Sequence, residues 1–242
     1  MTQDINDQLV LIAGESGTGK SASLMNLPSH ERVMYFNCEA GKRLPFKNKF
    51  QNFTITDPYQ VHEGFDHALN NPSIDIVITD TLTFLMDMYE SQYVLPATNT
   101  MEAWGQFAQY FKTLMQEKVA SSDKAVIFLA HTSSTYDEKS MLMRSSVPIK
   151  GSLKNNGIEA YFSTVVATKK MSLKDLEPYG SDLLHITPQD EMLGFKHVFQ
   201  TQLTKNTIGE RIRSPMGMFS VAETYIDNDA GQLLKHLQAY YA

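Results

Sequence analysis

Short apolar runs alternate along the chain with stretches in which apolar residues recur at the spacing of a helix. The apolar runs that predict strands cover residues 9–13, 32–36, 53–55, 74–80 and 125–130. The helical pattern covers residues 21–27, 59–69, 101–119 and 231–241. Because the predicted strands are apolar on both faces and alternate with helices, the pattern predicts a parallel sheet covered by helices on both sides.

The pattern changes after residue 131. Residues 132–157 are mostly polar or small and make a longer segment than an ordinary connection. Beyond it, three stretches predict strands without long helices between them, at residues 160–167, 197–203 and 216–221. The expected fold is therefore α/β, a single domain over residues 1–242 with a mostly parallel sheet flanked by helices and antiparallel strands added toward the C-terminus.

Composition sets limits on the class of protein. Of the 242 residues, 42% are hydrophobic, which is enough for a substantial core. The one cysteine, Cys38, excludes a disulfide framework and fits a cytoplasmic protein. The first eight residues are polar and no apolar run approaches the roughly 20 residues of a membrane span, so we expect neither a signal peptide nor a membrane partner. A net charge of −6 argues against a globally basic nucleic-acid binder but leaves local basic patches open.

A phosphate-binding loop follows the first predicted strand and precedes a predicted helix. It fits the pattern G-x-x-x-x-G-K-[ST], whose glycines let backbone amides approach a phosphate closely. Lys20 is expected to reach the β- and γ-phosphates, and the Ser21 hydroxyl to bind Mg²⁺. The predicted ATP-binding residues are Gly14, Glu15, Ser16, Gly17, Thr18, Gly19, Lys20 and Ser21.

Three further side chains follow predicted strands at the edge of the sheet where the phosphate loop lies. Asp80 ends an apolar strand and is the expected Mg²⁺ partner, whereas Asp75 begins that strand and lies at the wrong end. Glu39 is the expected catalytic residue that orients the attacking water. His131 is the expected sensor of the γ-phosphate, with Thr132 as the adjacent alternative.

Two basic segments suggest partners. The first, in residues 132–157, has no acidic residue between Lys139 and Lys154, so it predicts a grip on a nucleic-acid backbone when ATP is bound, although a solvated loop explains it too. The second flanks a predicted hairpin turn at residues 206–209 and predicts a charged finger that reaches a neighbouring subunit's ATP, or simply the protection of an edge strand. The DNA-binding candidates are Lys139, Arg144, Lys150 and Lys154, and the finger candidates are Lys205, Arg211 and Arg213. Trp104, on the apolar stripe of a helix, is expected to pack against the core.

The set of motifs resembles the phage-encoded single-domain RecA-like ATPases linked to recombination and single-strand annealing. The motifs that carry the resemblance are, in chain order, residues 14–21, 35–39, 76–81, 104–105, 127–131 and 203–205. The resemblance implies a RecA-type core that hydrolyses Mg-ATP, binds single-stranded DNA and assembles into rings or filaments. It also implies a single-strand-binding or annealing protein as a further partner, and a location in the cytoplasm of a host cell.

Other nucleotide-binding classes fit the sequence less well. A GTPase needs an N-K-x-D motif and a D-x-x-G switch, and Asp80 is followed by neither. A small-molecule kinase needs an arginine-rich lid, and residues 139–154 hold a single arginine, Arg144. An ATP-switched module that binds a partner protein and hydrolyses ATP poorly stays open, and DNA-stimulated turnover is the observation that separates it from a DNA-binding ATPase.

Overall fold

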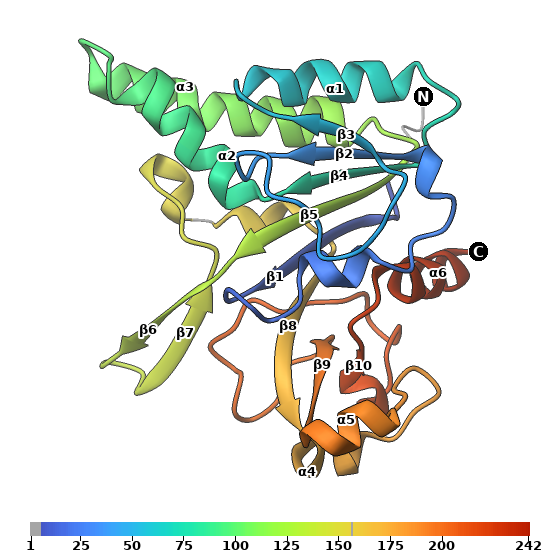
Figure 1. The fold of residues 1–242 in the computed structure, drawn as a ribbon. Helices are drawn as coiled ribbons and strands as arrows, with labels where there is room; N and C mark the ends of the chain where they lie inside the picture. Colours follow the sequence, from blue (N-terminus) through green and yellow to red (C-terminus); the bar gives the residue numbers. More distant parts are fainter. Residues whose placement is uncertain (1–5, 156) are drawn as a thin grey trace.

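An eight-stranded sheet forms the centre of the computed structural model, which describes residues 6–155 and 157–242 (Figure 1). Its strands run in the order β10-β9-β8-β1-β5-β4-β2-β3. Their bounds are β1 (Leu9–Gly14), β2 (Val33–Asn37), β3 (Gln51–Thr54), β4 (Ile76–Asp80), β5 (Ala125–His131), β8 (Thr164–Ser172), β9 (Phe195–Gln200) and β10 (Tyr225–Asp227).

The pairing is mostly parallel, as the alternation of strands and helices predicts. Strands β8, β1, β5, β4, β2 and β3 are all parallel to one another, while β9 and β10 add in antiparallel fashion at one end. This arrangement confirms the expected RecA-like α/β fold. It also places β5 between the strand that leads into the phosphate loop and the strand that ends at Asp80.

Alternating side chains of the buried strands supply two separate cores. In β1, Leu9, Leu11 and Ala13 face the helices α1, α2 and α3, whereas Val10 and Ile12 face the opposite core with α6. The α-helices are α1 (Tyr59–Leu69), α2 (Leu82–Tyr89), α3 (Thr100–Thr113), α4 (Leu173–Leu176), α5 (Pro188–Leu193) and α6 (Ala230–Tyr241). Single π-turns extend α2 over Glu90–Val94 and α3 over Leu114–Val119. Short 3-10 helices cover Ser21–Leu24, His30–Arg32, Gly151–Asn155, Ile158–Tyr161, Glu177–Tyr179 and Val221–Thr224.

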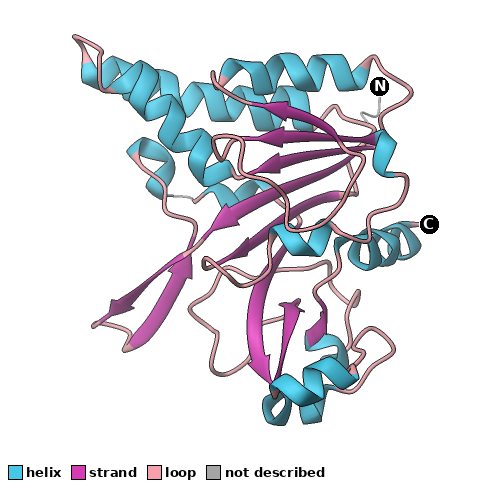
Figure 2. Cartoon of the chain, in the orientation of Figure 1, coloured by secondary structure: helices cyan, strands magenta, loops and turns pink. Residues whose placement is uncertain are grey.

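The segment after β5 is a hairpin where the sequence pattern predicts an irregular loop. Strands β6 (Ser133–Asp137) and β7 (Leu142–Ser146) pair only with each other as a two-stranded sheet. The hairpin projects away from the central sheet (Figures 1 and 2). Because both of its faces are largely exposed, it shows no apolar alternation from which strands could be predicted.

Two other expectations are wrong in detail. Residues 216–221 form no strand, because Pro215 and Gly217 make a turn there and Met216 is exposed; the last strand is β10, a few residues later. Residues 206–209 do not join two strands either, but lie in a turn capped by the hydroxyls of Thr204 and Thr207. Within the described residues, the helices are all too short or too polar to cross a membrane.

Candidate functional site

The phosphate loop leaves β1 at the sheet edge where β5, β4 and β2 also end. In the register, Gly14 pairs with His131 and Asn37 pairs with Asp80, so the four strands deliver their last residues to one place. Gly17 and Gly19 have φ angles of 78° and 103°, which other residues rarely adopt. The helix expected over residues 21–27 is only the 3-10 turn Ser21–Leu24, so loop amides rather than a long helix must supply the anion seat.

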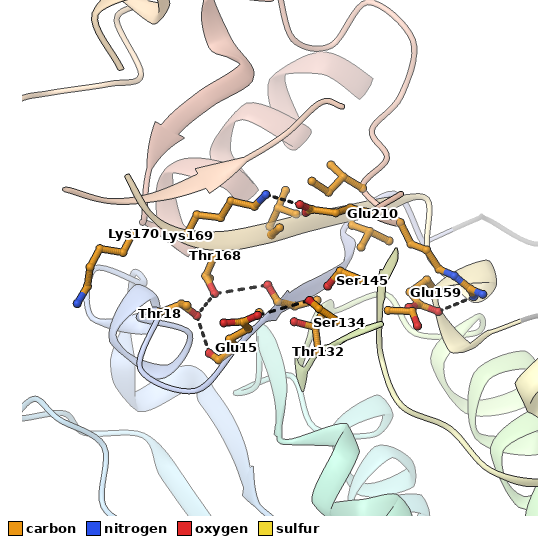
Figure 3. Close-up of a pocket in the computed structure, with 18 of the residues that line it drawn as sticks. Glu15, Thr18, Thr132, Ser134, Ser145, Glu159, Thr168, Lys169, Lys170 and Glu210 are labelled. Atoms are coloured by element: carbon orange, nitrogen blue, oxygen red, sulfur yellow. Dashed lines mark hydrogen bonds and ion pairs between the residues drawn. The ribbon is translucent and has the colours of Figure 1, made fainter. Parts of the chain in front are cut away.

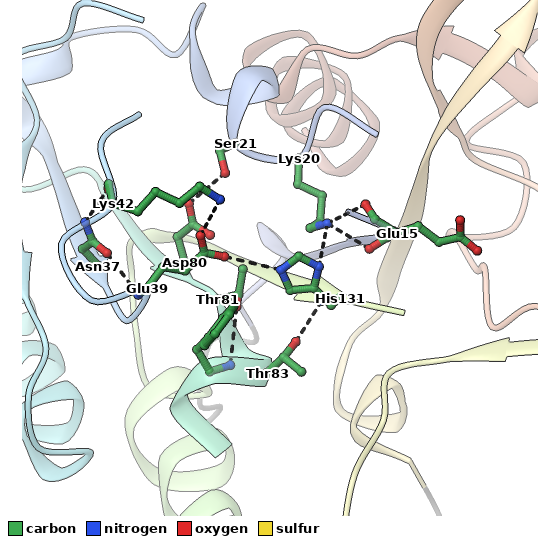
Figure 4. A network of polar contacts seen from close by, with 12 residues as sticks. Glu15, Lys20, Ser21, Asn37, Glu39, Lys42, Asp80, Thr81, Thr83 and His131 are labelled. Atoms are coloured by element: carbon green, nitrogen blue, oxygen red, sulfur yellow. Dashed lines mark hydrogen bonds and ion pairs between the residues drawn. The ribbon is translucent and has the colours of Figure 1, made fainter. Parts of the chain in front are cut away.

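Lys20 is folded back onto its own loop. Its Nζ donates to the carbonyl oxygens of Gly14 at 2.9 Å and Glu15 at 2.8 Å, and lies 3.2 Å from Nδ1 of His131 (Figure 4). Burial lowers the pKa of Lys20 to about 8, although the nearby carboxylates of Asp80 and Glu39 act against that shift. A buried ammonium satisfied only by carbonyls and an imidazole is suited to exchange these partners for phosphate oxygens.

Asp80 and Ser21 lie together as the sequence predicts, and they fit a Mg²⁺ ion. Asp80 Oδ2 accepts hydrogen bonds from Ser21 Oγ at 3.0 Å and from the Tyr35 hydroxyl at 2.6 Å. Its other oxygen, Oδ1, is buried without a hydrogen-bond partner, and burial raises the pKa of Asp80. A bound cation would satisfy this oxygen and offset the cost of burying the charge.

The metal would not sit in a cage made by protein alone. In the part of the chain that the structure describes, no group of three His, Cys, Asp or Glu side chains is arranged to hold a metal. Ser21 and Asp80 would therefore share the ion with nucleotide phosphates and water, which is how Mg²⁺ is usually held. Asp75 lies at the start of β4, at the far end of the strand, and pairs with Arg32 instead.

Glu39 lies between two nitrogen groups at the same sheet edge. Its Oε1 lies 3.4 Å from Nε2 of His131, and its Oε2 accepts from Lys42 Nζ at 2.7 Å. The hydrogen bond to His131 is the main cause that lowers the pKa of Glu39 to about 2, with Lys42 next. His131 thus contacts Glu39 with one ring nitrogen and Lys20 with the other, and its backbone N–H donates to Thr83 Oγ1 at 2.8 Å (Figure 4).

The C-terminal strands hold the phosphate loop from the opposite side, through residues that the sequence pattern did not single out. His197 on β9 lies 2.8 Å from the carbonyl of Thr18, and Asn228 donates to the carbonyl of Gly19 at 2.9 Å. Thr168 on β8 contacts the Thr18 hydroxyl at 2.5 Å (Figure 3). A side chain at Gly19 would clash with Asn228, so this glycine is required by contact as well as by its φ angle.

These residues line a cavity of about 670 Å³. Lys20, Ser21, Tyr35, Glu39, Asp80 and His131 lie on one side of it, and residues 227–229 with Lys196 and His197 lie on the other. The volume is in the range of small-molecule and cofactor sites. The cavity therefore brings together every residue predicted to bind nucleotide, metal or attacking water.

The predicted DNA-binding residues lie on or near the hairpin but differ in their partners. Arg144 pairs with Asp137 across the hairpin, and Lys150 pairs with Glu90 at the end of α2. Lys139 at the turn and Lys154 are exposed, and neither takes part in an ion pair within the described residues. The basic segment is thus half neutralised by carboxylates of the same chain.

The finger candidates lie outside the nucleotide cavity of their own chain. Lys205 and Arg213 are exposed. Arg211 donates from Nη1 to the buried carboxylate of Glu159 at 3.1 Å. Trp104 packs against the core beside Phe107, as its place on the helix predicts.

The chain matches one family model over most of its length. That model is described as an AAA domain, and it covers residues 6–206, which include the phosphate loop, Glu39, Asp80 and His131. No curated protein matches the chain. Among solved structures, one ATPase domain matches with 14% identity and a TM-score of 0.42, over 93% of this chain and 86% of that one, and a similarity of this size carries no functional inference. The extent of the family match and the phosphate loop place the chain in the AAA domain family, as a P-loop ATPase domain.

Proposed function

We propose that the protein binds Mg-ATP in the cavity at the sheet edge and hydrolyses it with Glu39 as the residue that orients water. Lys20 and the loop amides would hold the phosphates, and Ser21 and Asp80 would hold the metal, which neutralises charge on the transferred phosphoryl group. The observation that carries this proposal is the convergence of Lys20, Ser21, Asp80, Glu39 and His131 on one cavity from four different segments.

We further propose that the hairpin binds single-stranded DNA in a manner that depends on the nucleotide. His131 is the last residue of β5 and Ser133 is the first of β6, so the hairpin begins two residues after the contact with Lys20. A second link joins the base of the hairpin to the phosphate loop, because Ser134 Oγ lies 3.5 Å from Glu15 Oε1 (Figure 3). Movement of Lys20 toward a phosphate would change the partners of His131 and so reach the hairpin.

DNA binding would rest mainly on Lys139 and Lys154, which are exposed and carry no carboxylate partner among the described residues. Tyr136 on β6 is also exposed and presents a ring on which a base could stack. Assembly into a ring or filament would bring Lys205, Arg211 or Arg213 toward a neighbour's nucleotide, and this is part of the same proposal.

A nucleotide-switched protein-binding module is the second candidate, and one observation favours it. The hairpin exposes Tyr136, Met141 and Met143, which suits a protein contact better than a phosphate backbone. The in-chain pairing of Arg144 and Lys150 points the same way, because it reduces the charge available to DNA.

Binding of a fluorescent oligonucleotide separates the two candidates. With an ATP analogue and Mg²⁺, we expect Lys139→Glu combined with Lys154→Glu to weaken binding at least tenfold and to reduce the slope of log affinity against log salt by about 1 to 2. Lys112→Glu, at an exposed lysine on α3, is the matched control and should change little. Wild-type protein that binds DNA equally with ATP analogue and ADP, or not at all, contradicts the DNA proposal and favours the protein-binding module.

A further inference from the structure

A tight turn after β2 places Lys42 against the proposed catalytic carboxylate. Ala40 and Gly41 have φ angles of 51° and 77°, and the N–H of Lys42 donates to the carbonyl of Glu39 at 3.0 Å. Asn37, which is buried, fixes the turn from inside: its Nδ2 donates to the Lys42 carbonyl at 2.8 Å, and its Oδ1 accepts from the Glu39 N–H at 3.1 Å. The turn is therefore held in shape independently of the ion pair that Lys42 makes.

Glu39 in this arrangement is engaged on both oxygens. His131 contacts Oε1 and Lys42 contacts Oε2. A carboxylate that orients water must offer an oxygen to that water, so one of the two contacts has to open before hydrolysis. The contact with Lys42 is the shorter, and it joins a carboxylate to an ammonium that reaches it from the side of the solvent.

Lys42 has a second position available within the cavity. Its side chain is 67% exposed, while that of Glu39 is only 8% exposed, so the lysine is the partner free to move. Lys42 lines the same cavity as Lys20 and Ser21. The terminal phosphate of ATP brings more negative charge into this cavity than the single charge of Glu39, and a lysine is a flexible point charge that can follow it.

We propose that Lys42 is a positioning residue that exchanges Glu39 for the terminal phosphate of ATP. In the protein without nucleotide, Lys42 holds Glu39 and keeps it from water. When ATP binds, Lys42 moves to the terminal phosphate and releases Oε2 of Glu39 for the attacking water. With ADP, the terminal phosphate is missing and the contact with Glu39 persists. This inference rests on the proposed ATP hydrolysis at this site and adds a residue that distinguishes ATP from ADP.

Nucleotide discrimination tests the proposal directly. We expect Lys42→Met to weaken binding of a non-hydrolysable ATP analogue about tenfold and binding of ADP less than twofold, both measured with Mg²⁺ by calorimetry. Lys42→Arg should restore most of the discrimination because it keeps the charge. Lys47→Met is the matched control, because Lys47 is exposed on the same loop but does not line the cavity. Equal losses for both nucleotides, or no loss, would overturn the proposal.

A double-mutant cycle with Glu39 provides a readout that a structural role would not move. If Glu39 and the phosphate compete for Lys42, Glu39→Gln tightens ATP-analogue binding at least threefold more with Lys42 present than in the Lys42→Met background. Additive effects of the two changes would contradict the exchange. A wild-type protein that binds neither nucleotide overturns the proposed function and this inference together, whereas normal discrimination in Lys42→Met overturns only the role of Lys42.

Discussion

Glu159→Gln offers a stability test of how the hairpin is anchored to the body of the protein. Glu159 is 1% exposed, and both of its oxygens are used: Oε1 accepts from the N–H of Val147, just after β7, at 2.8 Å, and Oε2 accepts from Arg211 Nη1 at 3.1 Å. Glutamine keeps one acceptor but turns its other group into a donor that faces a guanidinium. Val147 and Arg211 are thus both left poorly satisfied.

The size of the effect follows from burial. A hydrogen bond to a charged group contributes about 1.5–3 kcal/mol, and removing one partner of a buried ion pair costs about 3–5 kcal/mol. Because the Arg211 side chain is 38% exposed, water recovers part of this cost, so we expect a loss of about 2 kcal/mol. For a chain of this length that corresponds to a fall in Tm of about 4–8 °C.

Urea unfolding of Glu159→Gln beside Asp66→Asn measures the difference. Asp66 pairs with Lys118 on the surface and is half exposed, so its loss should cost less than about 1 kcal/mol. If Glu159→Gln were no more destabilising than Asp66→Asn at an unchanged m-value, the anchoring role would be wrong.

Three further predictions concern the nucleotide site. Glu39→Gln should lower ATP turnover at least 100-fold while nucleotide binding persists; turnover within threefold of wild type would refute the catalytic role. The affinity for ATP should fall as pH rises above about 8, because burial lowers the pKa of Lys20 to about 8 and only the protonated ammonium attracts phosphate; titration of a labelled ATP analogue between pH 7 and 10 checks this, and a flat profile would contradict it. Tyr35→Phe removes one of the two hydrogen bonds to Asp80 Oδ2, so the Mg²⁺ concentration that supports half-maximal turnover should change at least threefold; an unchanged requirement would mean that Tyr35 does not position the metal ligand.

The main part of the site could be predicted because parallel strands end at one edge of a sheet. The phosphate loop, Asp80, Glu39 and His131 each follow an apolar run, and the topology brings them together without further information. Tyr35 and Lys42 were not predicted. The role of Tyr35 depends on which face of β2 it occupies, and that of Lys42 depends on a left-handed turn that only the fold reveals.

The elements that were missed bury little, or bury it without a clear period. Helix α2 is eight residues long and apolar on most sides, so it shows no amphipathic stripe. The hairpin β6–β7 has no buried face, and β10 is only three residues long. The helix expected after the phosphate loop is shortened to a 3-10 turn, and Leu24 and Leu27 are buried there all the same. Tertiary contact, rather than local pattern, defines each of these segments.

ATP turnover with and without single-stranded DNA tests the central proposal most directly, with Lys20→Ala as the blank. The account predicts Mg²⁺-dependent turnover that depends on Lys20, rises severalfold with DNA, and loses that rise when Lys139 and Lys154 are both changed to glutamate. Turnover that depends on Lys20 but is indifferent to DNA at low salt would contradict the coupling and leave the protein-partnered switch as the better explanation.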